Sequence, residues 1–171
     1  MTNLRVWHAS RDPYHCSFRF LRLLVAGAES VELERLRILD MFLLYPSLLH
    51  RSSLPQELKN KFRALNIEKP HKIFMHLPSP AAIFQDLRLY QNSATIQLAA
   101  KGLIDSAELK QGTIQLLDWA IPSELRKRTE ERNIQDQGLS SFLVGPFSNI
   151  PLRGSASVYR RVGLPTRVVG E

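Results

Sequence analysis

The segment from residue 31 to residue 45, VELERLRILDMFLLY, constrains the fold more than any other part of the chain. Its first half mixes charged and apolar residues at helical spacing, whereas its second half is apolar on almost every side. A helix of that kind must pack against several neighbours, and Pro46 ends it. With 171 residues, 44% of them hydrophobic, the chain has enough apolar material to enclose this helix in one domain. We therefore expect a mainly helical domain built around it.

A helix is also predicted before this segment. Asp12 and Pro13 form a typical start, with aspartate as the N-cap and proline in the first turn, and Gly27 ends the segment. Helical spacing predicts a buried stripe of Tyr14, Phe18, Leu21 and Val25. It also predicts a basic ridge of His15, Arg19 and Arg22. That ridge is either a solvated face or a contact for an acidic partner or a phosphate backbone.

Two further helices are expected in the middle of the chain. Residues 53–67 predict a short one with Leu58, Phe62 and Leu65 facing inward. Ser79 and Pro80 repeat the cap-plus-proline start, and the polar residues 91–93 predict a break before a short second helix that ends at Gly102.

The stretch that follows predicts a small β-hairpin. Ala107 and Leu109 alternate, residues 110–112 form a glycine turn, and Ile114 and Leu116 continue the same face. Helix, turn and hairpin together are typical of a winged helix, here at about residues 79–118. The fold class is thus mainly α with a small β-hairpin wing (α+β), a winged-helix-like core with an N-terminal helical pair.

The last third of the chain alternates in character. Residues 124–133 are almost entirely polar, with charges at the spacing of helical ion pairs, whereas residues 139–152 are apolar and are expected to dock on the core or a partner. We expect residues 1–150 to form a single domain and residues 151–171 to form an extended C-terminal arm that orders on binding.

Asp40 and Cys16 are the two residues in apolar surroundings that invite a chemical interpretation. A carboxylate inside the apolar half of a helix needs a partner, and Arg37 or Arg35 is at suitable spacing, so a structural ion pair is favoured over catalysis. The lone Cys16, beside Phe18, Phe20 and Leu21, is expected to be a small buried hydrophobe.

No sequence motif points to an enzyme. The five histidines and the cysteine match no zinc spacing, and neither a phosphate-binding loop nor a Gly-x-Ser-x-Gly nucleophile motif occurs. We expect no catalytic residue, no metal and no cofactor. No apolar run is long enough to span a membrane and the N-terminus lacks a signal-peptide pattern, so a cytoplasmic protein without membrane contact is expected.

The net charge of +7 raises the question of nucleic acid. Residues 79–118 carry three basic and four acidic side chains, so the wing is better suited to docking a protein than to holding DNA. Residues 51–78 instead carry six basic and two acidic side chains. Candidate nucleic-acid contacts are Lys59, Lys61, Arg63, Lys69, Lys72, Lys101, Lys110, Arg160 and Arg161.

Several strings resemble a known family. DPYHCSFRFLRLL at residues 12–24, RLRILDMFLLYPSLL at residues 35–49, the glycine wing, and IPLRG with RRVGL near the C-terminus follow in that order. They resemble the small middle subunit of bacterial ABC-three-component systems, the group that includes Lamassu-type anti-phage defence.

The resemblance implies a non-enzymatic adaptor that bridges an SMC-like ATPase and an effector, commonly a nuclease, and holds the effector in check until foreign DNA is sensed. It implies that residues within the matching strings shape a partner-docking surface: Tyr14, His15, Arg19, Arg22, Asp40 and Tyr45. A stand-alone winged-helix DNA-binding regulator is the alternative, and a small hydrolase or nuclease that uses Asp40 is a third hypothesis.

Overall fold

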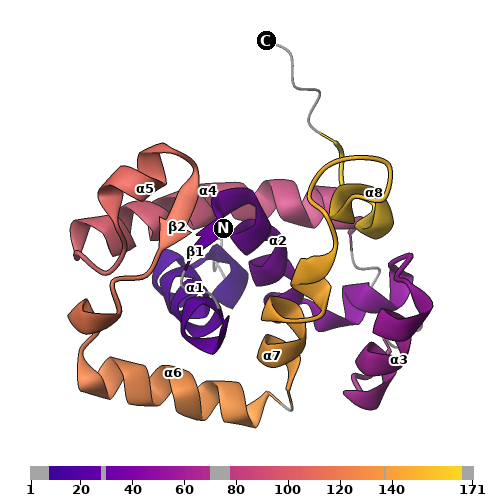
Figure 1. Cartoon of the computed structure of the whole chain (residues 1–171), viewed down its shortest axis with the longest axis horizontal. Helices are drawn as coiled ribbons and strands as arrows, with labels where there is room; N and C mark the ends of the chain where they lie inside the picture. Colours follow the sequence, from indigo (N-terminus) through magenta and orange to yellow (C-terminus); the bar gives the residue numbers. More distant parts are fainter. Residues whose placement is uncertain (1–7, 28–29, 70–77, 137, 167–171) are drawn as a thin grey trace, which may run out of the picture.

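The computed structural model describes residues 8–27, 30–69, 78–136 and 138–166. It is mainly helical, with one small antiparallel sheet, and short 3-10 helices (η) connect several of the elements (Figure 1). The elements follow in this order: η1 Ala9–Arg11, α1 Pro13–Gly27, β1 Ser30–Glu32, α2 Leu33–Leu44, η2 Pro46–Arg51, α3 Gln56–Ala64, α4 Pro80–Ala100, α5 Ser106–Lys110, β2 Thr113–Gln115, η3 Asp118–Ala120, α6 Ser123–Gln135, α7 Leu139–Val144, η4 Phe147–Asn149 and α8 Val158–Val162.

Helix α1 lies at the centre of the molecule. It begins as predicted, because the Asp12 side chain accepts a hydrogen bond from the backbone N–H of Tyr14 at 2.8 Å. It packs against α2, α4, α6 and α7, which surround it in Figure 1. Cys16, Phe20 and Leu23 are buried, whereas Tyr14 is 71% exposed. The predicted stripe is wrong at Tyr14 but right at Leu21, which is buried, and at Val25, which packs against the core. Because α1 is enclosed on several sides, its apolar contacts do not follow one narrow line.

Helix α2 confirms the expectation of a helix packed all round. Residues 38–43 are all buried, and Phe42 lies edge-on to Phe147 of η4 at 5.3 Å between ring centroids. The helix begins later than predicted, since residues 30–32 form strand β1 instead of its first turn.

The predicted β-hairpin does not form. Strand β2 is present where the return strand is expected, but it pairs antiparallel with β1, with Val31 opposite Ile114. Residues 106–110 form helix α5, because the Asp105 side chain accepts hydrogen bonds from the backbone N–H groups of Ala107 and Glu108 at 2.7 and 3.1 Å. The glycine turn at Gly112, with φ +83°, is found between a helix and a strand.

The break predicted at residues 91–93 is also absent, since α4 runs without interruption for 21 residues. Gln91 is fully buried and its side-chain amide donates to the backbone carbonyl of Arg37 at 3.1 Å. This contact with α2 stabilises helical geometry at residues whose intrinsic preference is for a turn. The helix begins at the Ser79 cap and ends before Gly102, φ +66°, as expected.

The C-terminal third packs on this core. Helix α6 carries the predicted ion pairs on its surface, among them Arg128 with Glu124 at 3.3 Å. Helix α7 and η4 bury Phe142, Leu143 and Phe147, so the apolar segment docks on the core as expected.

The extended arm expected from residue 151 is not what residues 151–166 form. Helix α8 buries Val158 and Val162, and the backbone N–H of Ser53 donates to the carbonyl of Arg161 at 2.7 Å. This part of the segment is therefore folded against η2 and the start of α3.

Candidate functional site

A single carboxylate ties the centre of the molecule together. Asp40 of α2 is fully buried and accepts two hydrogen bonds from the guanidinium of Arg19 on α1, at 2.5 Å from Nε and 3.2 Å from the terminal nitrogen. The side-chain amide of Gln91 on α4 donates to Asp40 at 2.9 Å, and Arg19 also donates to the carbonyl of Ala9 at 3.2 Å. The ion pair predicted for Asp40 is confirmed, but its partner is Arg19 and not Arg35 or Arg37.

The charges in this cluster are well satisfied. Burial alone would lower the pKa of Arg19, but the nearby Asp40 carboxylate outweighs it, and the pKa is raised. Burial, followed by the Asp40 charge, raises the pKa of the Cys16 thiol, whose Sγ lies 3.7 Å from Asp40. Cys16 is therefore a protonated, buried side chain, as the sequence predicts, and the cluster is structural.

Arg22 has a similar role one turn further along α1. It donates to Asp136 at 2.8 Å and to the side-chain oxygen of Asn133 at 3.0 Å, and Asn133 returns a hydrogen bond to the Arg22 carbonyl. Burial lowers the pKa of Arg22, and the Asp136 charge opposes that shift. Arg19 and Arg22 are each only 6% exposed, so the predicted basic ridge is wrong, because both arginines face acidic partners inside the protein.

The six residues expected to shape a docking surface therefore fall into two groups. Arg19, Arg22 and Asp40 are buried in ion pairs and cannot touch a partner. Tyr14 and His15 are exposed, and Tyr45 is half-buried after the end of α2.

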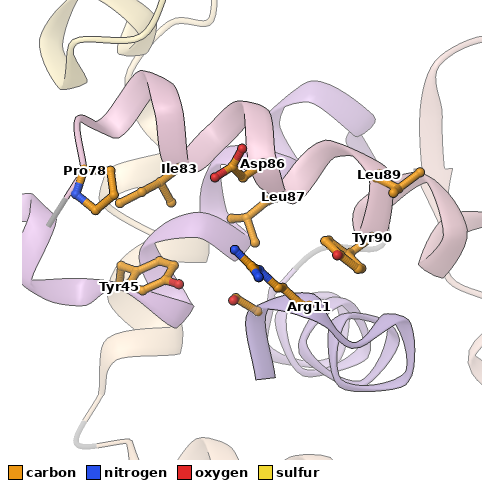
Figure 2. Close-up of a pocket in the computed structure, with 9 residues that line it drawn as sticks. Arg11, Tyr45, Pro78, Ile83, Asp86, Leu87, Leu89 and Tyr90 are labelled. Carbon is orange, nitrogen blue, oxygen red and sulfur yellow. The ribbon is translucent and has the colours of Figure 1, made fainter. Parts of the chain in front are cut away.

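Tyr45 lines a surface hollow of about 350 Å³ between η1, α2 and the first half of α4. In Figure 2 the Arg11 side chain lies between Tyr45 and Tyr90, beneath Leu87 of α4. Leu89 lines the same hollow and is 70% exposed. The hollow thus offers aromatic, aliphatic and cationic groups in one place, a combination common at protein contacts.

The outer face of α4 continues this apolar surface. Ile96 lies seven residues after Leu89, which places both on the same helix face, and it is 67% exposed. We refer to Leu89, Ile96 and the hollow beside Tyr45 as the α4 face. No sequence pattern singled out Leu89 or Ile96, since the predicted break in α4 obscured their common face.

The candidate nucleic-acid residues lie in two regions. Lys59, Lys61, Arg63 and Lys69 are exposed on or just after α3, and Arg160 is exposed on α8, whereas Arg161 is half-buried; Lys72 lies outside the described residues. Lys101 and Lys110 are exposed near α5, on the opposite side of the molecule from α3 (Figure 1). The structure brings the α3 and α8 residues to one end, because Arg161 also donates to the Ser53 carbonyl at 3.0 Å.

Within the described ranges, no three His, Cys, Asp or Glu side chains gather as a metal site would require. Nor does any helix in those ranges have both the length and the apolar character needed to cross a bilayer.

Comparison with known families decides the identity. The family described as ABC-three component (ABC-3C) system Middle Component 5 matches residues 5–167. The chain belongs to this family. No curated protein and no solved structure matches it.

As a Middle Component 5, the chain works within a multi-component system, which agrees with the resemblance seen in the sequence. The match runs from residue 5 to residue 167, so every element described above, from η1 to α8, lies within it.

Proposed function

We propose that this chain is a non-enzymatic adaptor in a bacterial anti-phage defence system, where it bridges an SMC-like ATPase and an effector nuclease. Membership of a middle-component family is the observation that carries the proposal, because a middle component has two other components to contact. The adaptor would hold the effector inactive until the ATPase senses foreign DNA. It would work in the cytoplasm without a cofactor of its own, and the defence group that its sequence resembles is the Lamassu type.

The α4 face supports this role. Leu89 and Ile96 expose aliphatic side chains on a helix that is otherwise anchored in the core through Gln91 and Asp40. An exposed apolar face on a rigid element is suited to docking, because little conformational freedom is lost when a partner covers it. We propose that one partner binds here, with Tyr45 lining the adjoining hollow and Tyr14 and His15 contributing from α1.

The alternative, a free-standing winged-helix regulator, has less support. It depends on a β-hairpin wing, and residues 106–110 form a helix while β2 pairs with a strand from the N-terminal part of the chain. The buried ion pair of Asp40 likewise leaves no exposed carboxylate there for a hydrolase.

Co-purification tests the adaptor role. The tagged chain is expressed with the products of its neighbouring genes, and the proteins retained at about 0.3 M salt, where exposed charge pairs are screened, are identified. We expect an ATPase and an effector in fixed ratio. Recovery of the chain alone as a dimer would contradict the proposal.

Substitutions in the α4 face sharpen this test. Leu89→Asp with Ile96→Asp should release one partner and leave the melting temperature unchanged, because both side chains are exposed. Ile134→Asp is the control matched to each of the two single variants, since Ile134 is an 80% exposed aliphatic residue on α6. Equal loss of the partner in the single variants and in the control would show that the α4 face is not the docking surface.

A further inference from the structure

The excess positive charge of the described chain is concentrated at one end. Residues 46–69 and 146–166, which form η2, α3, η4 and α8, contain eight basic and two acidic side chains. The rest of the described chain contains twelve of each. We call the first group the α3–α8 end; it has a strong positive field, whereas elsewhere the charges balance.

These segments are adjacent in the folded molecule although they are far apart in sequence. Ser53, just before α3, exchanges hydrogen bonds with Arg161 of α8, and both helices lie on the right in Figure 1. Lys59 and Arg63 are exposed and four residues apart, so they share one face of α3.

A hollow of about 550 Å³ lies at α8 within this end. Arg153 and Arg160 line it, together with Ser155, Ser157 and Gly154. Gly154 has a φ of +90°, and no atom lies within 4 Å of where its side chain would project. Ser157 is only 1% exposed, and its Oγ has no hydrogen-bond partner among the described residues. Glu34 is the acidic residue of the lining, so the two arginines outnumber it.

Two guanidinium groups and two hydroxyl groups around one hollow are suited to a phosphate. Guanidinium groups present paired N–H donors that match phosphate oxygens, and serine hydroxyls supply further donors. The exposed Lys59 and Arg63 on the neighbouring helix α3 offer further cations for phosphates of the same backbone.

The exposed apolar residues decide between nucleic acid and an acidic protein. In the described chain the large exposed hydrophobic residues are Tyr14, Leu89, Ile96, Trp119 and Ile134. None of them lies in the α3–α8 end. Protein interfaces have an apolar centre depleted in charge, whereas contacts to phosphate backbones are made largely by lysine and arginine.

We infer that the α3–α8 end binds the phosphate backbone of nucleic acid, with one phosphate in the hollow between Arg153 and Arg160. The site uses residues that the adaptor proposal does not use, so either can fail without the other.

The test measures binding of the purified full chain to a fluorescein-labelled mixed-sequence DNA duplex of about 20 base pairs, long enough for several phosphate contacts, over a series of salt concentrations. We expect a dissociation constant of about 10⁻⁴ to 10⁻⁶ M at physiological salt, with affinity falling linearly on a log–log plot against salt. Absence of binding at low salt would overturn the inference.

A charge-matched pair of variants locates the site. Arg153→Glu with Arg160→Glu should weaken binding by about tenfold or more and flatten the slope of the salt dependence by roughly 0.9 for each phosphate that the variant no longer neutralises. Lys101→Glu with Lys110→Glu makes the same change in net charge at exposed positions outside the α3–α8 end, and should have a much smaller effect. Equal effects from both would show that only net charge matters and would overturn the inference.

A replacement variant and a competitor polymer are also measured. Lys59→Glu with Arg63→Glu, on the exposed face of α3, replaces the first variant if circular dichroism shows that variant to be unfolded, and the same weakening is expected. Poly-L-glutamate of equal total charge is used as a competitor. If it displaces the wild-type chain as well as unlabelled duplex does, the surface recognises acidic polymers in general and nucleic acid is not its specific partner.

Discussion

Arginines in two regions of this molecule have opposite environments. Arg19 and Arg22 of α1 are each 6% exposed and bind Asp40 and Asp136, whereas Arg153 and Arg160 are exposed at the α3–α8 end, where acidic residues are scarce. The first pair holds helices together and the second is free to meet a partner. A basic residue in a sequence therefore says little about its role until the position of the nearest carboxylate is known.

Substitutions at the buried arginines are expected to change stability, whereas substitutions at the exposed arginines are expected to change binding. Removing one partner of a buried ion pair leaves an unpaired charge in the interior, which is costly, while changing an exposed cation alters the surface field at little cost in stability. The effect of a substitution should consequently be measured by denaturation in the buried region and by binding at the α3–α8 end.

The largest effect is expected at Asp40. Asp40→Ala should lower the free energy of unfolding by about 3 kcal/mol, because it leaves Arg19 buried without its carboxylate. Urea denaturation monitored by circular dichroism measures this change. Asp86→Ala on the exposed side of α4 is the control and should have little effect. Similar values for both variants would mean that Asp40 does not anchor the core.

A smaller effect is expected at Arg22. Arg22→Gln should cost about 2 kcal/mol because the charged hydrogen bond to Asp136 is removed. Asp136→Asn and the double variant complete a thermodynamic cycle, measured by the same denaturation assay. We expect a coupling energy of about 1 kcal/mol or more, since the two side chains are in direct contact. Strict additivity would contradict the pairing.

A still smaller effect is expected at α8. Arg161→Ala should cost about 1 kcal/mol, because Arg161 donates to the carbonyls of Ser53 and Ala156. Arg160→Ala, its exposed neighbour, should leave the free energy of unfolding unchanged while weakening nucleic-acid binding. If the two variants lose stability equally, α8 is not fastened through Arg161.

The smallest effect concerns an exposed pair on α3. The hydrogen bond from Lys61, at 2.7 Å, and then its charge lower the pKa of Glu57. The pair is therefore present at neutral pH and is lost as the pH falls through the lowered pKa. Lys61→Gln should raise the pKa of Glu57 to its ordinary value in an NMR titration of the side-chain carboxyl, with no measurable change in melting temperature. Lys59→Gln is the control and should shift it less.

Local signals in the sequence predicted the parts of the fold that local physics governs. The start of α1 at Asp12, the Ser79 cap, the end of α4 before Gly102 and the ion pairs of α6 all depend on residues within one or two helical turns. The apolar character of residues 38–43 likewise predicted their burial.

Features set by distant residues were not predicted. Gln91 and its polar neighbours are typical of a helix break, yet Gln91 is buried against α2 and donates to Arg37 and Asp40 from within an uninterrupted α4. The sequence pattern predicts residues 107–109 as the partner of strand β2. Instead β2 pairs with β1, about eighty residues earlier in the chain, and the adjoining Leu116 forms an antiparallel bridge with Ile104. The Asp105 cap was a local signal for α5 that the short alternation of apolar residues obscured.

In the candidate site, too, features set by nearby residues were predicted and features set by distant residues were not. Helical spacing places Arg19 and Arg22 on one face of α1 and so predicts that they are surface residues, but it carries no information on the position of Asp136, which is more than a hundred residues away in the chain. The sequence did indicate the basic residues of α3, which lie on a short surface helix where few contacts intervene.

The anchoring of three helices on Asp40 has a consequence for synthesis of the chain. Asp40 and the apolar half of α2 are translated well before Gln91, and β1 well before its partner strand at residues 113–115. In a shorter nascent chain Asp40 already has Arg19 of α1 as its partner, but it lacks Gln91, and α2 lacks its contacts with α4 and α7. The domain therefore completes its core late in translation, and a ribosome that stalls before α4 is made leaves uncovered the side of α2 that packs on α4 and α7.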